Sequence, residues 1–187
     1  MGLFDLIRKN PATQPAMPPL LGELIERYAL EKKEPAEGSL SGTQWWEGRD
    51  QGRLIAFMER GRDLALYAGE PAEITEIYLV RAAPDESPAL AATKRHIERI
   101  TGTQGAALAA QFRLGAQPAG ALFDLAPLRL PALLEGIPRL SASVREVMIF
   151  DNLRGLSLAL DASATRDTID ADLKLAHAVL QALEAAE

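Results

Sequence analysis

The sequence of 187 residues predicts an α+β domain. We expect a largely antiparallel sheet of about six strands with helices packed on one face, a long C-terminal helix and an N-terminal proline-rich arm. Strand-like segments occur in runs instead of alternating strictly with helices, which favours antiparallel pairing. Two pairs of these segments are joined by links short enough for hairpins, and a long amphipathic pattern closes the chain.

The first ten residues form a short amphipathic segment. Its apolar face consists of Leu3, Phe4, Leu6 and Ile7, and two cations follow. Residues 11–19 contain four prolines, which remove backbone donors and fix φ, so neither a helix nor a central strand can include them. We therefore expect residues 1–19 to be an amphipathic peptide on a proline-rich tether, and residues 20–187 to be a single domain.

The elements of the first half follow from the spacing of apolar residues. Residues 20–33 place apolar side chains three or four positions apart, which predicts a helix with prolines on either side. After a glycine-rich loop, alternating apolar residues predict four strands, the middle two of them joined as a hairpin. These strands cover residues 43–47, 53–59, 63–68 and 76–81.

A helix with clear start and stop signals is predicted over residues 88–101, because Ser87 can cap it, Pro88 suits its first position and Gly102 can end it. The following stretch, residues 105–138, gives mixed signals. Residues 106–110 favour helix, residues 112–114 favour strand, and prolines allow short helical pieces near 119–123 and 130–135. Whether this stretch lines a ligand pocket stays open.

The end of the chain is clearer. Residues 144–150 and 155–160 predict a second hairpin, and a helix follows from about residue 166 to 186. The main apolar stripe of this helix is Ile169, Leu173, Ala176, Leu180 and Leu183. A second apolar edge of Leu175, Val179 and Ala182 indicates packing in a broad groove of the same domain or, as the alternative, a homodimer seam.

Composition excludes several classes of protein. The net charge is −6 and no basic block is present, so we expect no nucleic-acid partner. The chain has no cysteine, which excludes disulfides and cysteine-bound metals and fits a reducing compartment. No apolar run approaches the roughly 20 residues of a spanning helix, and no signal-peptide pattern opens the chain, so we expect a cytoplasmic protein.

Few residues suggest catalysis. His96 and His177 each lie on a predicted helix without a metal-ligand type four residues away, so we expect boundary or exposed histidines. Glu70, Glu73 and Glu76 could form an acid/base or divalent-cation site, but a solvated acidic strand edge explains them better. We predict no catalytic, cofactor or metal site, while an enzyme that uses only carboxylates stays an alternative.

Trp45 and Trp46 are adjacent on a predicted strand and therefore point to opposite faces. Either both indoles are covered within the domain, or one belongs to a contact surface, where large amphipathic aromatic side chains are enriched.

Together these features favour a non-catalytic protein-interaction module, an adaptor or accessory subunit that docks through its N-terminal apolar peptide. The predicted partner-binding residues are Leu3, Phe4, Leu6, Ile7, Trp45 and Trp46. Two alternatives remain: a small acidic chaperone or immunity-type protein that masks a cognate partner, and a peripheral membrane protein that makes weak surface contact through the same peptide.

Overall fold

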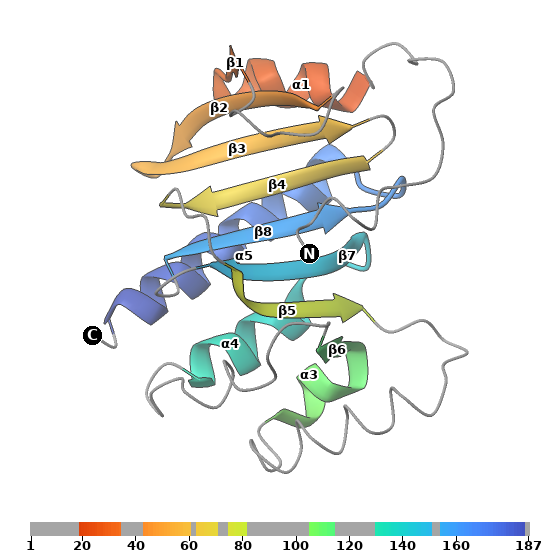
Figure 1. Cartoon of the computed structure of the whole chain (residues 1–187), viewed down its shortest axis with the longest axis vertical. Coiled ribbons are helices and arrows are strands. Elements are labelled where there is room, and N and C mark those ends of the chain that lie inside the picture. The colour runs from red at the N-terminus through yellow and green to blue at the C-terminus, as the bar shows by residue number, and fades with distance from the viewer. Residues whose placement is uncertain are drawn as a thin grey trace.

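The computed structural model describes residues 19–34, 43–60, 63–70, 75–81, 105–114, 130–150 and 154–185. Within them, eight strands form one sheet in the order β1-β2-β3-β4-β8-β7-β5-β6, and every neighbouring pair is antiparallel (Figure 1). The α+β class and the antiparallel sheet predicted from the sequence are confirmed.

The six longer strands correspond to the six predicted segments. They are β2 (Gln44–Asp50), β3 (Arg53–Arg60), β4 (Asp63–Gly69), β5 (Thr75–Arg81), β7 (Val144–Phe150) and β8 (Gly155–Leu160). Two three-residue strands, β1 (Glu31–Lys33) and β6 (Phe112–Leu114), form the edges of the sheet. The described helices are α1 (Pro19–Tyr28), α3 (Ala106–Gln111), α4 (Leu130–Gly136), the 3-10 helix η2 (Ile137–Arg139) and α5 (Arg166–Ala185).

The strand pairs confirm both predicted hairpins, β3 with β4 and β7 with β8. A further hairpin joins β2 to β3 through Gln51 and Gly52, whose φ values are 51° and 79°. Two successive positive φ values are typical of the two-residue type I′ turn, whose twist matches that of the strands. The pairing of β4 with β8 then joins the two halves of the chain in one sheet.

The predicted first helix ends earlier than expected, and its prediction over residues 29–33 was wrong. Ala29 adopts a left-handed φ of 49°, and the Leu30 N–H donates to the Ile25 carbonyl at 3.0 Å. Leu30 is then buried against Gly48, where an added Cβ would overlap it. Residues Glu31–Lys33 continue as the exposed, charged edge strand β1, a feature that discourages pairing with other sheets.

The helices pack on one face of the sheet, as predicted. All four described α-helices contribute side chains to the main hydrophobic core. In Figure 1, α5 runs diagonally behind the strands, α1 lies along the upper edge beside β2, and α3 and α4 lie toward the lower edge. The predicted stripe of α5 is fully buried: Ile169, Leu173, Ala176, Leu180 and Leu183.

The mixed signals at residues 106–114 reflect a helix followed directly by a strand, α3 and then β6. The predicted helical piece near residues 130–135 is α4. Three other predicted segments lie outside the described residues: the N-terminal arm up to residue 18, the helix over 88–101 and the helical piece near 119–123.

Candidate interaction surface

The face of the sheet opposite the helices carries a second apolar cluster, which we call the free-face cluster. Its members are Trp45, Leu54, Ala56, Met58, Ala65 and Tyr67. Each described α-helix contributes to the main core, but none contributes to this second cluster. Because side chains alternate along a strand, residues such as Ile55 and Phe57 reach the helices while their neighbours reach the opposite face.

The same face continues across β8 and β7. Tyr67 on β4 is opposite Ser157 on β8, which is opposite Met148 on β7. On the other side, Tyr67 is opposite Ala56 on β3. The exposed fractions along this row are 0% for Ala56, 5% for Tyr67, 1% for Ser157 and 3% for Met148. The centre of the face opposite the helices is therefore sealed from water.

Tyr67 covers this row at a point where β8 has no side chain. An added Cβ at Gly155 would overlap the Tyr67 hydroxyl, so glycine allows the phenol to lie over β8. Burial, with a smaller contribution from the charge of Glu70, raises the pKa of Tyr67 to about 12. The phenol is therefore neutral at physiological pH and belongs to an apolar surface.

Trp45 and Trp46, which were predicted to bind a partner, lie on opposite faces of the sheet. Trp46 is 3% exposed and belongs to the main core, with the Lys32 ammonium 5.7 Å from its ring centroid. Trp45 is half-buried at the rim of the free-face cluster, and its indole Nε1 donates to Glu47 Oε1 at 2.6 Å. Of the predicted partner-binding residues, Trp45 is thus the one placed on the free face. Leu3, Phe4, Leu6 and Ile7 lie outside the described residues.

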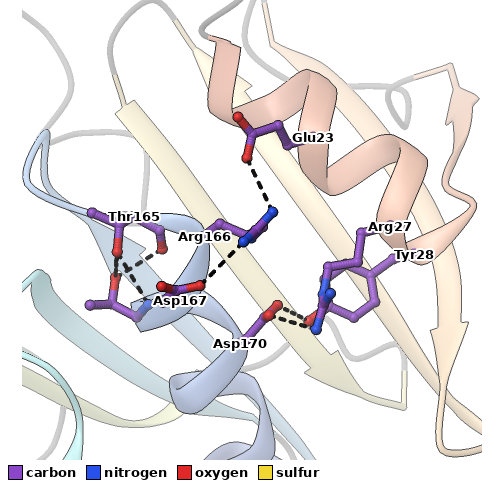
Figure 2. A network of polar contacts seen from close by, with 8 residues as sticks. Glu23, Arg27, Tyr28, Thr165, Arg166, Asp167 and Asp170 are labelled. Carbon is purple, nitrogen blue, oxygen red and sulfur yellow. Dashed lines mark hydrogen bonds and ion pairs between the residues drawn. The ribbon is translucent and has the colours of Figure 1, made fainter.

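A polar network fastens α1 to the start of α5 (Figure 2). The Tyr28 hydroxyl donates to Asp170 Oδ1 at 2.5 Å, and Arg27 Nη2 lies 2.7 Å from Asp170 Oδ2. Burial, followed by the hydrogen bond to Asp170, raises the pKa of Tyr28 to about 12. Arg166 approaches Glu23 at 4.0 Å, so the network joins two helices and does not form a ligand site.

A second polar network surrounds Asp172, which is 2% exposed. Its carboxylate accepts from the Ser141 N–H at 2.8 Å and from the Ser141 hydroxyl at 2.6 Å. Nearby, Arg81 donates to the Ser141 carbonyl at 2.8 Å and to the Val144 carbonyl at 2.7 Å, and burial lowers its pKa. A serine activated as a nucleophile needs a base such as histidine beside it. The described contacts of Ser141 contain none, so this cluster holds the connection between η2 and β7 to α5 and β5.

His177 is 4% exposed, so the prediction of a boundary or exposed histidine was wrong for this residue. Its Nε2 lies 3.0 Å from Asp50 Oδ2. Burial lowers the pKa of His177, and the charge of Asp50 opposes that shift. The pair joins α5 to the β2–β3 turn. Sequence reasoning missed it because 127 positions separate the partners; the one available signal was that His177 follows Leu173 by four residues.

No further group of side chains within the described ranges forms a reaction centre. No three acidic or histidine side chains there gather as a metal ion would require. Glu70 pairs with Arg154 at 3.2 Å, whereas Glu73 lies outside the described residues. None of the described helices combines the length and the apolar character needed to span a membrane. His96 also lies outside the described part of the chain.

Comparison with known proteins adds a similarity in fold. No family model and no curated protein matches the chain. Among solved structures, the crystal structure of the mycobacterial trehalose monomycolate transport factor A, TtfA, is similar with a TM-score of 0.50. The two chains are 8% identical, and the match covers 88% of this chain and 92% of that chain. The match shows that the two proteins share a fold. Because the sequence identity is so low, it shows nothing about a shared role.

Proposed function

We propose that this chain is a non-catalytic accessory protein that binds a larger protein partner through its N-terminal apolar segment, with Trp45 at an adjoining surface. The free-face cluster carries this proposal, because it offers a rim of half-buried Trp45 and Leu54. The described polar clusters, in contrast, are engaged within the fold. The protein of similar fold is named a transport factor, and an accessory role of that kind needs binding surfaces. The absence of cysteine supports a cytoplasmic location.

The binding step is the burial of one small apolar face. Fully burying a leucine, isoleucine or phenylalanine side chain contributes about 1.5–3 kcal/mol, so four such side chains can exceed the cost of ordering the segment. The proline-rich tether limits the entropy lost on docking, because its conformations are already restricted. Arg8 and Lys9 change the rate of encounter more than its strength.

Trp45 suits the edge of such an interface. Its indole nitrogen is already hydrogen-bonded to Glu47, so the ring is oriented before a partner arrives. Large aromatic side chains that are partly buried and pre-oriented are typical anchors of protein interfaces. Trp46 lies within the main core and would act on the interface only by supporting β2.

The second apolar edge of α5 offers weaker support for a homodimer. Val179 is buried, and an added Cβ at Gly136 of α4 would overlap it. Leu175 is half-buried against the main core. This edge is therefore used largely within the domain, and we propose a heterologous partner ahead of a second copy of the chain.

The test is quantitative capture with the full chain carrying a C-terminal tag. The double variant Leu3→Ala with Phe4→Ala should lose the partner, and Trp45→Ala should weaken capture. The matched control Thr13→Ala with Gln14→Ala changes the tether without altering the apolar face and should retain the partner. Far-UV circular dichroism should be the same in all variants.

With the purified partner, the double variant should weaken the dissociation constant by more than about tenfold, which corresponds to about 1.4 kcal/mol. Capture that survives the double variant would move the interface onto the folded domain and overturn the proposed role of the segment. Vesicle binding that requires the same residues, without a protein partner, would instead favour the peripheral membrane alternative.

A further inference from the structure

We propose that the contact between His177 and Asp50 is an acid-sensitive latch, which holds the β2–β3 turn against α5 while the imidazole is neutral and releases the turn when the imidazole takes up a proton. The latch is inferred from the surroundings of His177 in the fold. Its consequence for partner binding rests on the function proposed above.

The first step concerns how the imidazole is held. His177 is 4% exposed, and its Nε2 lies 3.0 Å from Asp50 Oδ2. Because an ionised carboxylate only accepts hydrogen bonds, Nε2 carries the hydrogen of the neutral ring, and Nδ1 is left with a lone pair. Nδ1 is buried as well, and it has no hydrogen-bond partner among the described residues. The buried position therefore suits the neutral ring.

Protonation makes the same position unfavourable. A proton on Nδ1 turns that atom into a second donor, in a place where no described side chain or backbone group accepts from it. A buried donor without an acceptor has lost its hydrogen bond to water and gained none in return. The positive charge is disfavoured for the same reason, because burial removes it from water. The imidazolium satisfies both nitrogens by turning out toward solvent.

The charges beside His177 come from the turn and from the start of β3. Burial is the largest influence on the imidazole and lowers its pKa, the charge of Asp50 opposes this shift, and the charge of Arg53 adds to it. Arg53 is itself held to α5, because its Nη2 lies 2.5 Å from Glu184 Oε2. The attraction of Asp50 for a protonated ring is thus countered by a cation fixed nearby.

The other elements packed against α5 are α1, α4, β4 and β8, and in the described part of the chain they add no further charge that acts on the imidazole. Charged side chains on these elements and on α5 itself are engaged elsewhere or exposed. Examples are the pair of Arg27 with Asp170, the pair of Glu70 with Arg154, and the exposed Glu135 and Lys174. Proton uptake at this contact is therefore governed by His177 and its two neighbours.

The part that the latch releases is small. Gln51 and Gly52 at the tip of the turn are exposed, and the described polar contacts of the turn with α5 are those of Asp50 with His177 and of Arg53 with Glu184. The second contact involves an exposed carboxylate, and ion pairs of this kind contribute little alone. The apolar stripe of α5 stays in the main core. Protonation therefore frees the turn and leaves the helix in place.

The consequence reaches the candidate interaction surface. The turn ends the β2–β3 hairpin, which carries Trp45 and Leu54 on its opposite face. Leu54 directly follows Arg53, so a released turn leaves this rim less ordered. A partner that contacts the rim then has to order it on binding, which lowers the affinity. Mild acid should accordingly weaken partner binding before it unfolds the domain.

The latch can be tested with pairs of nitroxide labels in the full chain, because the chain has no cysteine of its own. Gln51→Cys with Gln181→Cys places two exposed labels across the contact, and Glu26→Cys with Ala171→Cys places two exposed labels on α1 and α5 as a reference. Double electron–electron resonance is recorded between pH 7.5 and 5. The first pair should gain a population at longer distance, whose ratio to the closed population rises by up to about tenfold per pH unit below 6.5. The reference pair should not change.

Two variants of the first labelled chain make the result decisive. His177→Gln should stay closed at every pH, because a glutamine amide can donate to Asp50 and does not titrate. His96→Gln removes the other histidine of the chain and should keep the response.

Distances across the turn that do not change with pH would overturn the proposal. An equal change in His177→Gln would also overturn it, as would a change in both label pairs together, because the domain would then be unfolding as a whole. The experiment contains no partner, so its failure is separate from a failure of partner capture.

Discussion

The two faces of the sheet differ in how they are covered. The helix-covered face is lined by large aliphatic and aromatic side chains, among them Phe57, Leu66 and Ile149, that interdigitate with four helices. The opposite face is lined at its centre by alanine, serine, methionine and tyrosine, with Trp45 and Leu54 at its rim. The first face defines the fold, because its cover is part of the same continuous core. The second face carries a separate, smaller apolar cluster to which the described helices contribute no side chain.

Polar contacts reinforce this difference. Asp170, Asp172 and His177 are all on α5, and each bonds to a different part of the fold. On the free face, the described hydrogen bond from Trp45 to Glu47 stays within one strand. Hydrogen bonds that cross between elements restrict how those elements can move, so the three contacts of α5 fix the helix layer to the rest of the fold.

The largest effect should come from truncating the helix-covered face. Phe57→Ala removes a fully buried ring, and such a change typically costs about 3–5 kcal/mol. Met58→Ala changes the next residue on the same strand but on the opposite face, and should cost less than Phe57→Ala, because it removes a smaller side chain that is 9% exposed and lies outside the main core. Urea denaturation followed by circular dichroism measures both values.

The pair of variants also tests the comparison itself. Equal losses of stability from Phe57→Ala and Met58→Ala would mean that the two faces belong to cores of equal rigidity. The slope of the unfolding free energy against urea should stay unchanged in both variants, because neither alters how much surface unfolding exposes.

Local patterns were enough to predict most of the sheet. Alternation such as Leu156, Leu158 and Leu160 with smaller residues between them identified β8 and its buried face. The extra edge strand β1 was missed, because Glu31–Lys33 carries no apolar alternation and becomes a strand only by pairing with β2. Edge strands of this kind depend on a neighbour and leave little local signal.

The candidate surface was less predictable. Adjacent tryptophans imply opposite faces, but only the packing of the helices on one face decides that Trp46 lies in the main core and Trp45 at the half-buried rim of the free-face cluster. A row such as Ala56, Tyr67 and Met148 comes from three strands that are distant in sequence. Pairing register, which a single sequence does not specify across long connections, brings these residues together.

A smaller loss of stability should follow from removing one buried hydrogen-bond acceptor of α5. Asp172→Ala leaves the Ser141 N–H and hydroxyl without their buried acceptor, which costs about 1–3 kcal/mol. Asp167→Ala, on the exposed first turn of the same helix, is the matched control and should cost less than about 1 kcal/mol. Thermal unfolding distinguishes the two, while near-constant tryptophan fluorescence of the folded protein would show that the environments of Trp45 and Trp46 are unaffected. Similar losses in both variants would show that the Asp172 network contributes little.

The smallest effect is a pH dependence of the helix-covered face. Because burial lowers the pKa of His177 below its ordinary value of 6.5, the unfolded chain binds a proton at this residue before the folded chain does. Below that pH the unfolded state therefore holds more protons, and the free energy of unfolding decreases as the pH falls. The contribution is fully present above about pH 6.5 and is lost on acidification, by at most about 1.4 kcal/mol per pH unit for one proton.

The free energy of unfolding is measured between pH 7.5 and 5 in the wild type and in variants, which separates the contribution of His177 from that of the other titratable groups. His177→Gln is neutral throughout and should give a flatter profile than the wild-type protein. Asp50→Asn removes the charge that partly opposes the shift, so the pKa of His177 should fall further and the stability lost on acidification should increase. Parallel profiles for the wild type and His177→Gln would show that His177 accepts a proton equally well in both states. The contact with Asp50 would then have to open readily, and the helix-covered face at the β2–β3 turn would be no more rigid than the face opposite it.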